Sequence, residues 1–413
     1  MGATPEVGAL PDADAAAAAE AARAAQPLWA LLPPSARARY VRRAAVAMLD
    51  ELDELADVLA DEAGWPCTHL VVSELLPAVR GLHALADEGP AALADRRLSS
   101  RAAVWRRSVS IQAPAGVIGL AGPSASPWHE PALEAAAALL AGNGVLLAAG
   151  PAAAAQRLRG VFLRAGIPGE LIVPVPDLGA VCDRVTRLSP PTRMGTLLVL
   201  RGAPRPAVVD AAVWAAFAGS GRHAAAAGRL IVSRTAAPGL AEAIAEQAAK
   251  LRVGDPRDPA TDVGLVAPTV TTSRAAFDLP PPGPVLAIVE AANDDEAISL
   301  ASTGGHDGVV SVWTADRERG ERIARSLPAA TVWVGRHAVP APAVPDRLAR
   351  HVAPRRLETR SRRAPAAMRL PTTQDVVEIQ GALAEARHGR ESRRWPALRK
   401  GVAALLRAAR RQR

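Results

Sequence analysis

The chain has 413 residues, of which 49% are hydrophobic and 22% are charged. This length allows two separate cores, and the composition is that of a folded protein rather than a disordered one. The formal net charge of +8 is uneven, because residues 346–413 hold 18 Arg or Lys against 6 Asp or Glu, which leaves the rest of the chain at −4. The basic character therefore belongs to the C-terminal part.

The sequence contains no run of about 20 apolar residues, so it predicts no membrane span. The stretch from Met1 to Ala25 is acidic and rich in Ala, and it lacks the basic start of a signal peptide. Two cysteines, Cys67 and Cys182, could form at most one disulfide, and neither has the spacing of a metal ligand. We therefore expect a cytoplasmic protein without a bound metal.

The first predicted elements are helices. Two prolines interrupt the chain at 33 and 34, and Ser35 is predicted to cap the next helix. Apolar residues at three- and four-residue spacing predict that this amphipathic helix covers 36–63, and a second helix is expected over 73–87. After these, the sequence predicts strands over 106–112, 117–120, 145–148 and 172–175, and helices over 131–140 and 152–165.

The second half continues this alternation of strands and helices. Asn293 followed by Glu296 resembles a capping box at the start of a helix. The region between Pro340 and Pro354 has weak periodicity and is expected to be loop. Strands are predicted over 230–232, 285–289, 309–313 and 331–334, and further helices over 240–251 and 316–327. Such alternation predicts an α/β fold with Rossmann-type parallel sheets.

Several recognisable stretches follow one another in a fixed order. The most specific are Leu251-Arg-Val-Gly-Asp-Pro256, with Asp262 and Gly264 downstream, and Ser311-Val-Trp-Thr314. In this order they resemble the aldehyde dehydrogenase superfamily. Together the matching stretches cover Ser35 to His337. The others are Gly116-Val-Ile-Gly119 with Pro123, Leu139-Leu-Ala-Gly-Asn143, Ala165-Gly-Ile-Pro168 and Trp214-Ala-Ala-Phe217 with Gly221 and Arg229-Leu-Ile-Val232.

This resemblance implies a Rossmann-type parallel-sheet domain and a second α/β domain of the catalytic type. N-terminal helices and a degenerate cofactor domain would occupy residues 1–200, and the catalytic-type domain residues 201–345. A degenerate C-terminal region with an oligomerisation-type strand would occupy 346–386. Residues 387–413 would form a basic tail.

The residues that the family uses for catalysis are missing at the matching positions. The family attacks the aldehyde with a Cys thiolate, because a thiolate is nucleophilic near neutral pH. That Cys lies five residues before the position of Arg229, where this chain has Ala224. The Asn that holds the oxyanion matches Ala125, and the general-base Glu matches Leu200. The resemblance therefore implies a family of aldehyde oxidoreductases but predicts that activity is lost in this chain.

The family would use NAD or NADP, and its binding residues are also replaced. The Lys that reaches the adenosine ribose matches Ala148. The Glu and Phe of the Glu-x-Phe-Gly-Pro motif match Pro280 and Pro282, although Gly283-Pro284 remains. The stretch from Leu178 to Leu200 is too short for the loop and helix that would face the pyrophosphate. We expect no bound cofactor.

Other residues could be proposed as substitutes. His223 adjoins the position of the nucleophile, but a single His beside an Ala run is usually packed or solvated. The Gly219–Ala224 stretch fits a loose dinucleotide pattern, yet it precedes a strand where a true fingerprint follows one. Cys182 and Cys67 are expected to be structural rather than nucleophilic.

The sequence leaves three hypotheses open. The first is a pseudoenzyme that acts as a scaffold or regulatory subunit, as a homo-oligomer or with an active aldehyde dehydrogenase, through strands at 106–112 and 374–380. The second is an NAD(P)-dependent oxidoreductase that acts on aldehydes with relocated catalytic residues. The third is a binding module whose tail, residues 387–413, contacts an acidic partner, anionic lipid or nucleic acid. A solvated tail without a function is the alternative to the third.

Overall fold

The computed structural model divides into two compact units, the first made of Met1–Ala92 and Pro114–Val352 and the second of Leu93–Ala113 and Ala353–Arg413. The domain boundaries expected from the sequence stay predictions. The structure describes residues 14–98, 106–122, 126–149, 152–188, 195–223, 225–236, 238–278, 283–303, 308–338, 344–360, 378–379, 381–382, 385 and 391–410.

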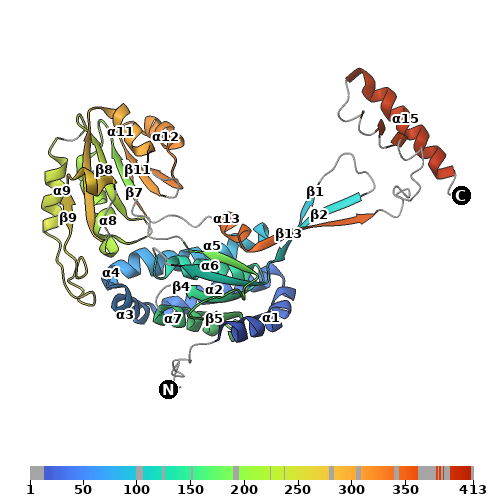
Figure 1. Ribbon diagram of the computed structural model, residues 1–413, viewed down its shortest axis with the longest axis horizontal. Helices are drawn as coiled ribbons and strands as arrows, with labels where there is room; N and C mark the ends of the chain where they lie inside the picture. Colours follow the sequence, from blue (N-terminus) through green and yellow to red (C-terminus); the bar gives the residue numbers. More distant parts are fainter. Residues whose placement is uncertain are drawn as a thin grey trace. The chain divides into compact units, whose positions relative to one another are not determined.

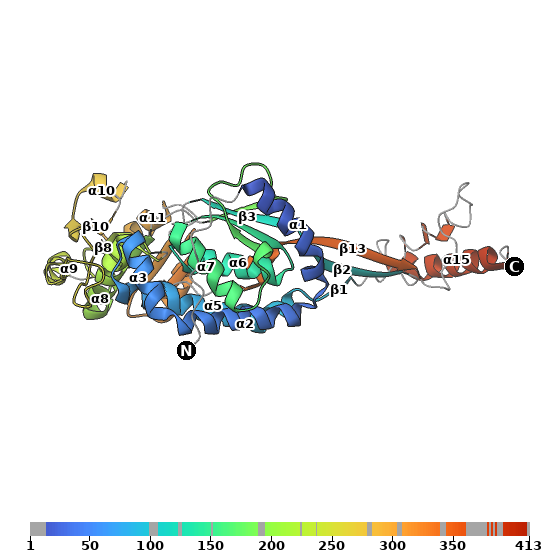
Figure 2. The ribbon, with the colours of Figure 1, turned by 90° about the horizontal axis from the view of Figure 1, so that it is seen from below.

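The first unit begins with helices that are arranged differently from the prediction (Figures 1 and 2). The expected single helix over 36–63 is two helices, because Glu51 leaves the helical conformation with φ −119° and ψ 22°. Ser35 is not a cap, since the helix already starts at Pro34, a residue suited to the first helical position. The helices are α1 (Ala15–Leu31), α2 (Pro34–Asp50), α3 (Leu52–Ala63), α4 (Cys67–Leu70), the π-helix η1 (Val71–Leu75) and α5 (Leu76–Ala92).

A four-stranded parallel sheet comes next, in the order β5-β4-β3-β6. On one face, Val117 and Leu146 pack against small Ala side chains of α1. Nearly every residue of the Ala-rich helix α6 is buried, and α6 contacts β3, β4 and α5. The elements are β3 (Val117–Gly122), α6 (His129–Leu140), β4 (Gly144–Ala149), α7 (Ala152–Arg164), the 3-10 helix η2 (Gly169–Leu171), β5 (Ile172–Pro174) and β6 (Arg184–Arg187).

The second sheet of this unit has six parallel strands in the order β12-β11-β7-β8-β10-β9. Helices α8 and α9 cover one face, and α10, α11 and α12 cover the other (Figure 1). The elements are β7 (Gly195–Val199), α8 (Arg205–Phe217), the 3-10 helix η3 (Ala218–Gly221), β8 (Ala227–Ser233), α9 (Leu240–Ala249), β9 (Thr269–Thr271), α10 (Arg274–Asp278), β10 (Val285–Ala291), α11 (Asp294–Ser302), β11 (Val309–Trp313), α12 (Arg317–Ser326) and β12 (Thr331–Val334). The next helix, α13 (Val344–Ala349), contacts α5 and α6 instead.

The α/β class with Rossmann-type parallel sheets is therefore confirmed. The capping box predicted at Asn293 is also present, because Asn293 Oδ1 accepts a hydrogen bond of 2.9 Å from the Glu296 amide at the start of α11. The Glu296 carboxylate in turn accepts from the Ala292 amide at 2.6 Å.

The second unit holds a three-stranded sheet and one long helix. The sheet has the order β1-β2-β13, from β1 (Arg96–Leu98), β2 (Arg106–Pro114) and β13 (Val352–Arg360), and β1 pairs with β2 antiparallel. Helix α15 covers Glu391–Arg410. The third strand is thus β13, whereas Glu378 and Ile379 of the expected strand at 374–380 are helical and most of that stretch lies outside the described residues.

Candidate functional site

The loop between α8 and β8 has an unusual backbone. Gly219, Ser220 and Gly221 have φ values of 54°, 54° and 70°, and Ser220 is the only non-glycine residue with positive φ in the described chain. A left-handed conformation costs a residue with a Cβ about 1–2 kcal/mol. The Gly219 amide donates to His69 Nδ1 at 3.1 Å, and a Cβ on Gly219 would lie 2.9 Å from the Trp65 ring. The loop is therefore held against the α3–α4 turn.

Aromatic and imidazole rings surround the end of this loop. The His223 and Ala225 residues are 2% and 0% exposed. The His223 ring centroid lies 4.6 Å from that of Trp214, and the His337 ring lies 5.9 Å from Trp214 and 4.9 Å from Trp333. Four rings from α8, the loop, β12 and the segment after β12 therefore enclose this part of the chain.

Both nitrogens of His337 have hydrogen-bond partners. Its Nε2 lies 2.6 Å from the Ala225 carbonyl oxygen, and its Nδ1 lies 3.1 Å from Ser311 Oγ. Because a carbonyl only accepts, Nε2 must carry the proton. Trp313 Nε1 donates to Ser311 Oγ at 3.1 Å, so the Ser311 hydroxyl proton can be donated to Nδ1. Burial lowers the pKa of His337, which agrees with a neutral ring that has no free nitrogen to act as a base.

His223 is also held neutral. Its Nδ1 accepts from the Ala225 amide at 3.2 Å, so the proton of the neutral ring lies on Nε2. Burial, reinforced by the nearby His337, lowers the pKa of His223 to about 3. A general base for chemistry near neutral pH needs a pKa near the working pH and a free lone pair. His223 meets neither requirement.

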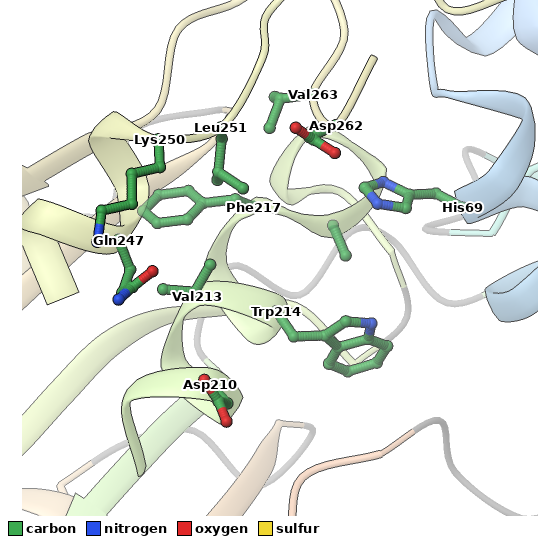
Figure 3. Close-up of a pocket in the computed structure, with 11 residues that line it drawn as sticks. His69, Asp210, Val213, Trp214, Phe217, Gln247, Lys250, Leu251, Asp262 and Val263 are labelled. Atoms are coloured by element: carbon green, nitrogen blue, oxygen red, sulfur yellow. The ribbon is translucent and has the colours of Figure 1, made fainter. Parts of the chain in front are cut away.

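A hollow of about 300 Å³ opens beside α8 and α9 (Figure 3). Its apolar wall includes Val213, Phe217 and Leu251, and Trp214 lies at its edge. Two of its charged residues are paired, since Lys250 Nζ lies 2.9 Å from Glu246 and Asp262 accepts from Arg252 at 2.9 and 3.1 Å. A third, Asp210, is exposed, so the hollow combines an apolar wall with an exposed carboxylate. The remaining lining residues are His69, Asp210, Ala218, Gln247, Lys250, Asp262 and Val263.

The N-terminus of α6 is closed by a carboxylate from the π-helix η1. Glu74 is 1% exposed, and its Oε2 accepts from the amides of Trp128 at 3.1 Å and His129 at 2.8 Å and from the Ser126 hydroxyl. Burial raises the pKa of Glu74 to about 7, although these hydrogen bonds oppose the shift. A negative charge is stabilised at a helix N-terminus. The donors at this end of α6 are therefore used within the protein.

The carboxyl ends of the four-stranded sheet carry few polar groups. In open parallel sheets, ligands bind beyond these ends. Among the last two residues of each strand, only Thr186 and Arg187 of β6 have polar side chains, and Ala148 and Ala149 end β4. Seven residues, 188–194, connect β6 to β7 of the other sheet. A connection of this length could hold at most about two turns of helix.

The aldehyde dehydrogenase family model matches residues 4–187, 195–274 and 265–345. The chain belongs to the aldehyde dehydrogenase family. A succinate-semialdehyde dehydrogenase [NADP(+)] 1 from Mycobacterium bovis is 26% identical over 387 residues, covering 75% of this chain and 83% of that protein. The interruption between residues 187 and 195 falls at the short connection from β6 to β7.

Solved structures share the fold at low sequence identity. A putative aldehyde dehydrogenase from Burkholderia cenocepacia has a TM-score of 0.77 at 19% identity, covering 86% of this chain and 91% of its own. An aldehyde dehydrogenase from Bacillus cereus, solved as an NAD+ complex, has a TM-score of 0.75 at 18% identity, covering 84% and 89%. No helix in the described residues is long and apolar enough to cross a membrane, and these residues contain no group of three or more His, Cys, Asp or Glu placed to hold a metal ion.

The position that the aldehyde dehydrogenase resemblance assigns to the general base lies in the core. Leu200 is 0% exposed and packs on one face of the six-stranded sheet with Ile231 and Phe277. Its neighbour Val199 is equally buried on the opposite face. A shift of the alignment by one residue toward the N-terminus would therefore still place a buried alkyl side chain there.

The other predicted positions are only partly described. Ala148 is half-buried at the end of β4. Ala224, Ala125, Pro280 and Pro282 lie outside the described residues. Of the two predicted positions that are described, neither Leu200 nor Ala148 lines the hollow beside α8. The network of Ser311, Trp313 and His337 was missed, because nothing in the sequence links β11 to a histidine beyond β12.

Both cysteines are free thiols. Burial raises the pKa of Cys67 and of Cys182, whereas a nucleophilic cysteine needs a lowered one. Cys182 packs with Leu178 beside Gly119 of β3. A Cβ added to Gly119 would lie 2.8 Å from the sulfur of Cys182. Cys67 Sγ lies 3.6 Å from Asp57 Oδ1, which further raises its pKa.

Proposed function

We propose that this chain is a catalytically inactive member of the aldehyde dehydrogenase family that acts as a scaffold or regulatory subunit. The observation that carries the proposal is the buried Leu200 at the general-base position, where a carboxylate would have to reach water. Ala224 at the nucleophile position, between buried His223 and Ala225, supports it. Ala125 at the oxyanion position removes a third group that the reaction requires.

The described residues do not fit a nicotinamide dinucleotide. Ala148 offers a methyl group where a cation would contact the ribose, and the strand ends beside it offer little that hydrogen-bonds. The connection over 188–194 is too short for a helix whose N-terminus could hold the pyrophosphate. Pro280 and Pro282 lack the groups that the family motif would use.

His337 and His223, at the end of the loop, do not supply a free base. His337 is hydrogen-bonded at both nitrogens, and His223 is neutral with its Nδ1 occupied. The raised pKa values of Cys67 and Cys182 disfavour the thiolate. These observations favour inactivity over an oxidoreductase with relocated catalytic residues.

The second unit offers a surface for assembly. Strand β13 lies at the edge of its sheet and is nine residues long. An edge strand presents backbone donors and acceptors that can pair with a strand of another chain. This geometry supports assembly with a second copy or with an active aldehyde dehydrogenase.

The test combines binding, turnover and assembly. We expect no heat of binding for NAD+ or NADP+ up to about 1 mM, the upper end of ordinary KM values, and no NADH formed from aldehydes. The variant Ala224→Cys restores a thiol and should stay inactive, because the base and the cofactor contacts remain absent. Light scattering after size exclusion, with and without a co-expressed active family member, measures assembly.

Two results would count against the proposal. Binding of either dinucleotide at micromolar concentration, or turnover by the unmodified chain or by Ala224→Cys, would mean that a working site remains. A monomer that captures no active family member would remove the subunit role.

A further inference from the structure

Helix α15 lies beyond the residues that match the aldehyde dehydrogenase family, which end at 345 (Figure 2). One of its faces is packed within the second unit. Ala397 and Ala404 are 4% and 0% exposed, and a Cβ on Gly401 would lie 3.0 Å from the Ala382 side chain. Arg407 pairs with Glu378 at 2.6 Å. These contacts fix which side of the helix faces outward.

The outward side carries a continuous row of apolar residues. Trp395, Leu398, Val402 and Leu406 are 74%, 40%, 54% and 59% exposed. Their spacing of three, four and four residues places them along one side of the helix. At 1.5 Å per residue the row is roughly 16 Å long. Scattered exposed apolar residues are ordinary, but a contiguous row of this kind indicates an interaction surface.

The charge around this row has one sign. The sequence from Ser392 to Arg410 contains six Arg or Lys residues and no Asp or Glu. Arg399 and Lys400 are exposed on the described part of the helix, directly beyond Leu398. An exposed apolar side flanked by cations fits a partner that is both apolar and negatively charged.

We propose that α15 is an interfacial helix that binds an anionic lipid bilayer and lies in its plane. Trp395 would sit at the headgroup level, Leu398, Val402 and Leu406 would enter the boundary of the acyl chains, and the Arg and Lys residues would contact lipid phosphates. Nucleic acid would use the charge but leave the apolar row in water. The proposal goes beyond the proposed subunit role and does not depend on it.

Co-flotation of the full chain with vesicles tests the proposal. We compare phosphatidylcholine vesicles that contain phosphatidylglycerol with vesicles of phosphatidylcholine alone. Binding to the anionic vesicles should be at least about tenfold stronger at low salt and should weaken as salt rises. The variant Leu398→Gln/Val402→Gln/Leu406→Gln should reduce this binding at least about tenfold. Arg399→Gln/Lys400→Gln should weaken it less.

A matched control changes three exposed apolar residues of the first unit. Leu31, Leu265 and Val266 are 80%, 77% and 56% exposed, and their replacement by Gln should leave vesicle binding unchanged. Circular dichroism and thermal unfolding check that each variant is folded.

Several outcomes would overturn the proposal. They are equal binding to neutral and anionic vesicles, no binding at low salt, or binding that survives the triple substitution in α15. Stronger binding to a DNA duplex or to polyglutamate, unaffected by the triple substitution, would assign the helix to a soluble polyanion instead.

Discussion

In the six-stranded sheet, β11 carries Ser311 and Trp313, whose hydrogen bonds fix His337 against the loop that precedes β8. In the four-stranded sheet, β3 and β4 end in Ala and Gly, and the chain leaves β6 by a connection of seven residues. Both sheets nevertheless have fully buried cores. The difference teaches that both sheets have a packed core, whereas a buried polar network at a strand end is described in the six-stranded sheet.

The largest expected effect is on the free energy of unfolding, and it tests whether both sheet cores contribute to stability. Leu146→Ala in β4 and Leu230→Ala in β8 each remove a side chain that is 0% exposed. Each should lower the free energy of unfolding by roughly 2–5 kcal/mol, because a buried cavity remains. Urea unfolding of both variants measures this. If Leu146→Ala cost less than about 1 kcal/mol, the four-stranded sheet would be a loose remnant rather than a retained core.

A smaller effect concerns the buried carboxylate of Glu74 at the start of α6. Its pKa in the folded state, about 7, is raised above the value in the unfolded chain, so its protonated form stabilises the fold at low pH. This contribution is lost as the pH rises through 7. Between pH 5 and 8 the unmodified chain should lose roughly 2–3 kcal/mol of stability relative to Glu74→Gln.

Unfolding of both proteins at a series of pH values measures that difference, in which the other titrating groups cancel. A constant difference across this range would mean that Glu74 titrates as an exposed residue does and that its burial is incomplete.

The smallest effect concerns the loop before β8. Ser220→Gly removes the Cβ from a residue with φ 54° and so relieves backbone strain. Because Gly also raises the entropy of the unfolded chain, the net gain in the free energy of unfolding should be at most about 1 kcal/mol. Ala substituted for Ser220 is the matched control, since it keeps the Cβ and should give no such gain. The Ser220 hydroxyl donates to the Gly64 carbonyl at 3.4 Å. Thermal unfolding of the two variants distinguishes them, and a loss of stability in Ser220→Gly would show that this hydrogen bond matters more than the strain.

The sequence predicted β3, β4, β5, β8, β10, β11 and β12 because these strands contain short apolar runs, but it did not predict β6, β7 or β9. It missed α1, whose Ala residues lie on both its buried and its exposed sides and so give little periodic contrast. It also missed β13, where Pro354 and the exposed Arg355 and Arg356 hide an edge strand. Charge and proline are tolerated at an edge because one side of the strand faces away from the sheet.

The candidate site was less predictable than the fold. A motif position such as Leu200 can be proposed by matching a motif to the sequence, but its burial depends on packing against Ile231 and Phe277 from distant segments. The same holds for His337, whose protonation is set by Ser311 and the Ala225 carbonyl. The tautomer of a histidine and the burial of a side chain depend on residues that are distant in the sequence, so a local sequence pattern does not predict them.

The short connection between β6 and β7 has a consequence for unfolding. β6 is an edge strand, whereas β7 lies in the middle of its sheet between β11 and β8. Only seven residues separate the two strands along the chain. The two sheets should therefore melt as one cooperative block, and native-state hydrogen exchange should report the same opening energy for β3 and β7.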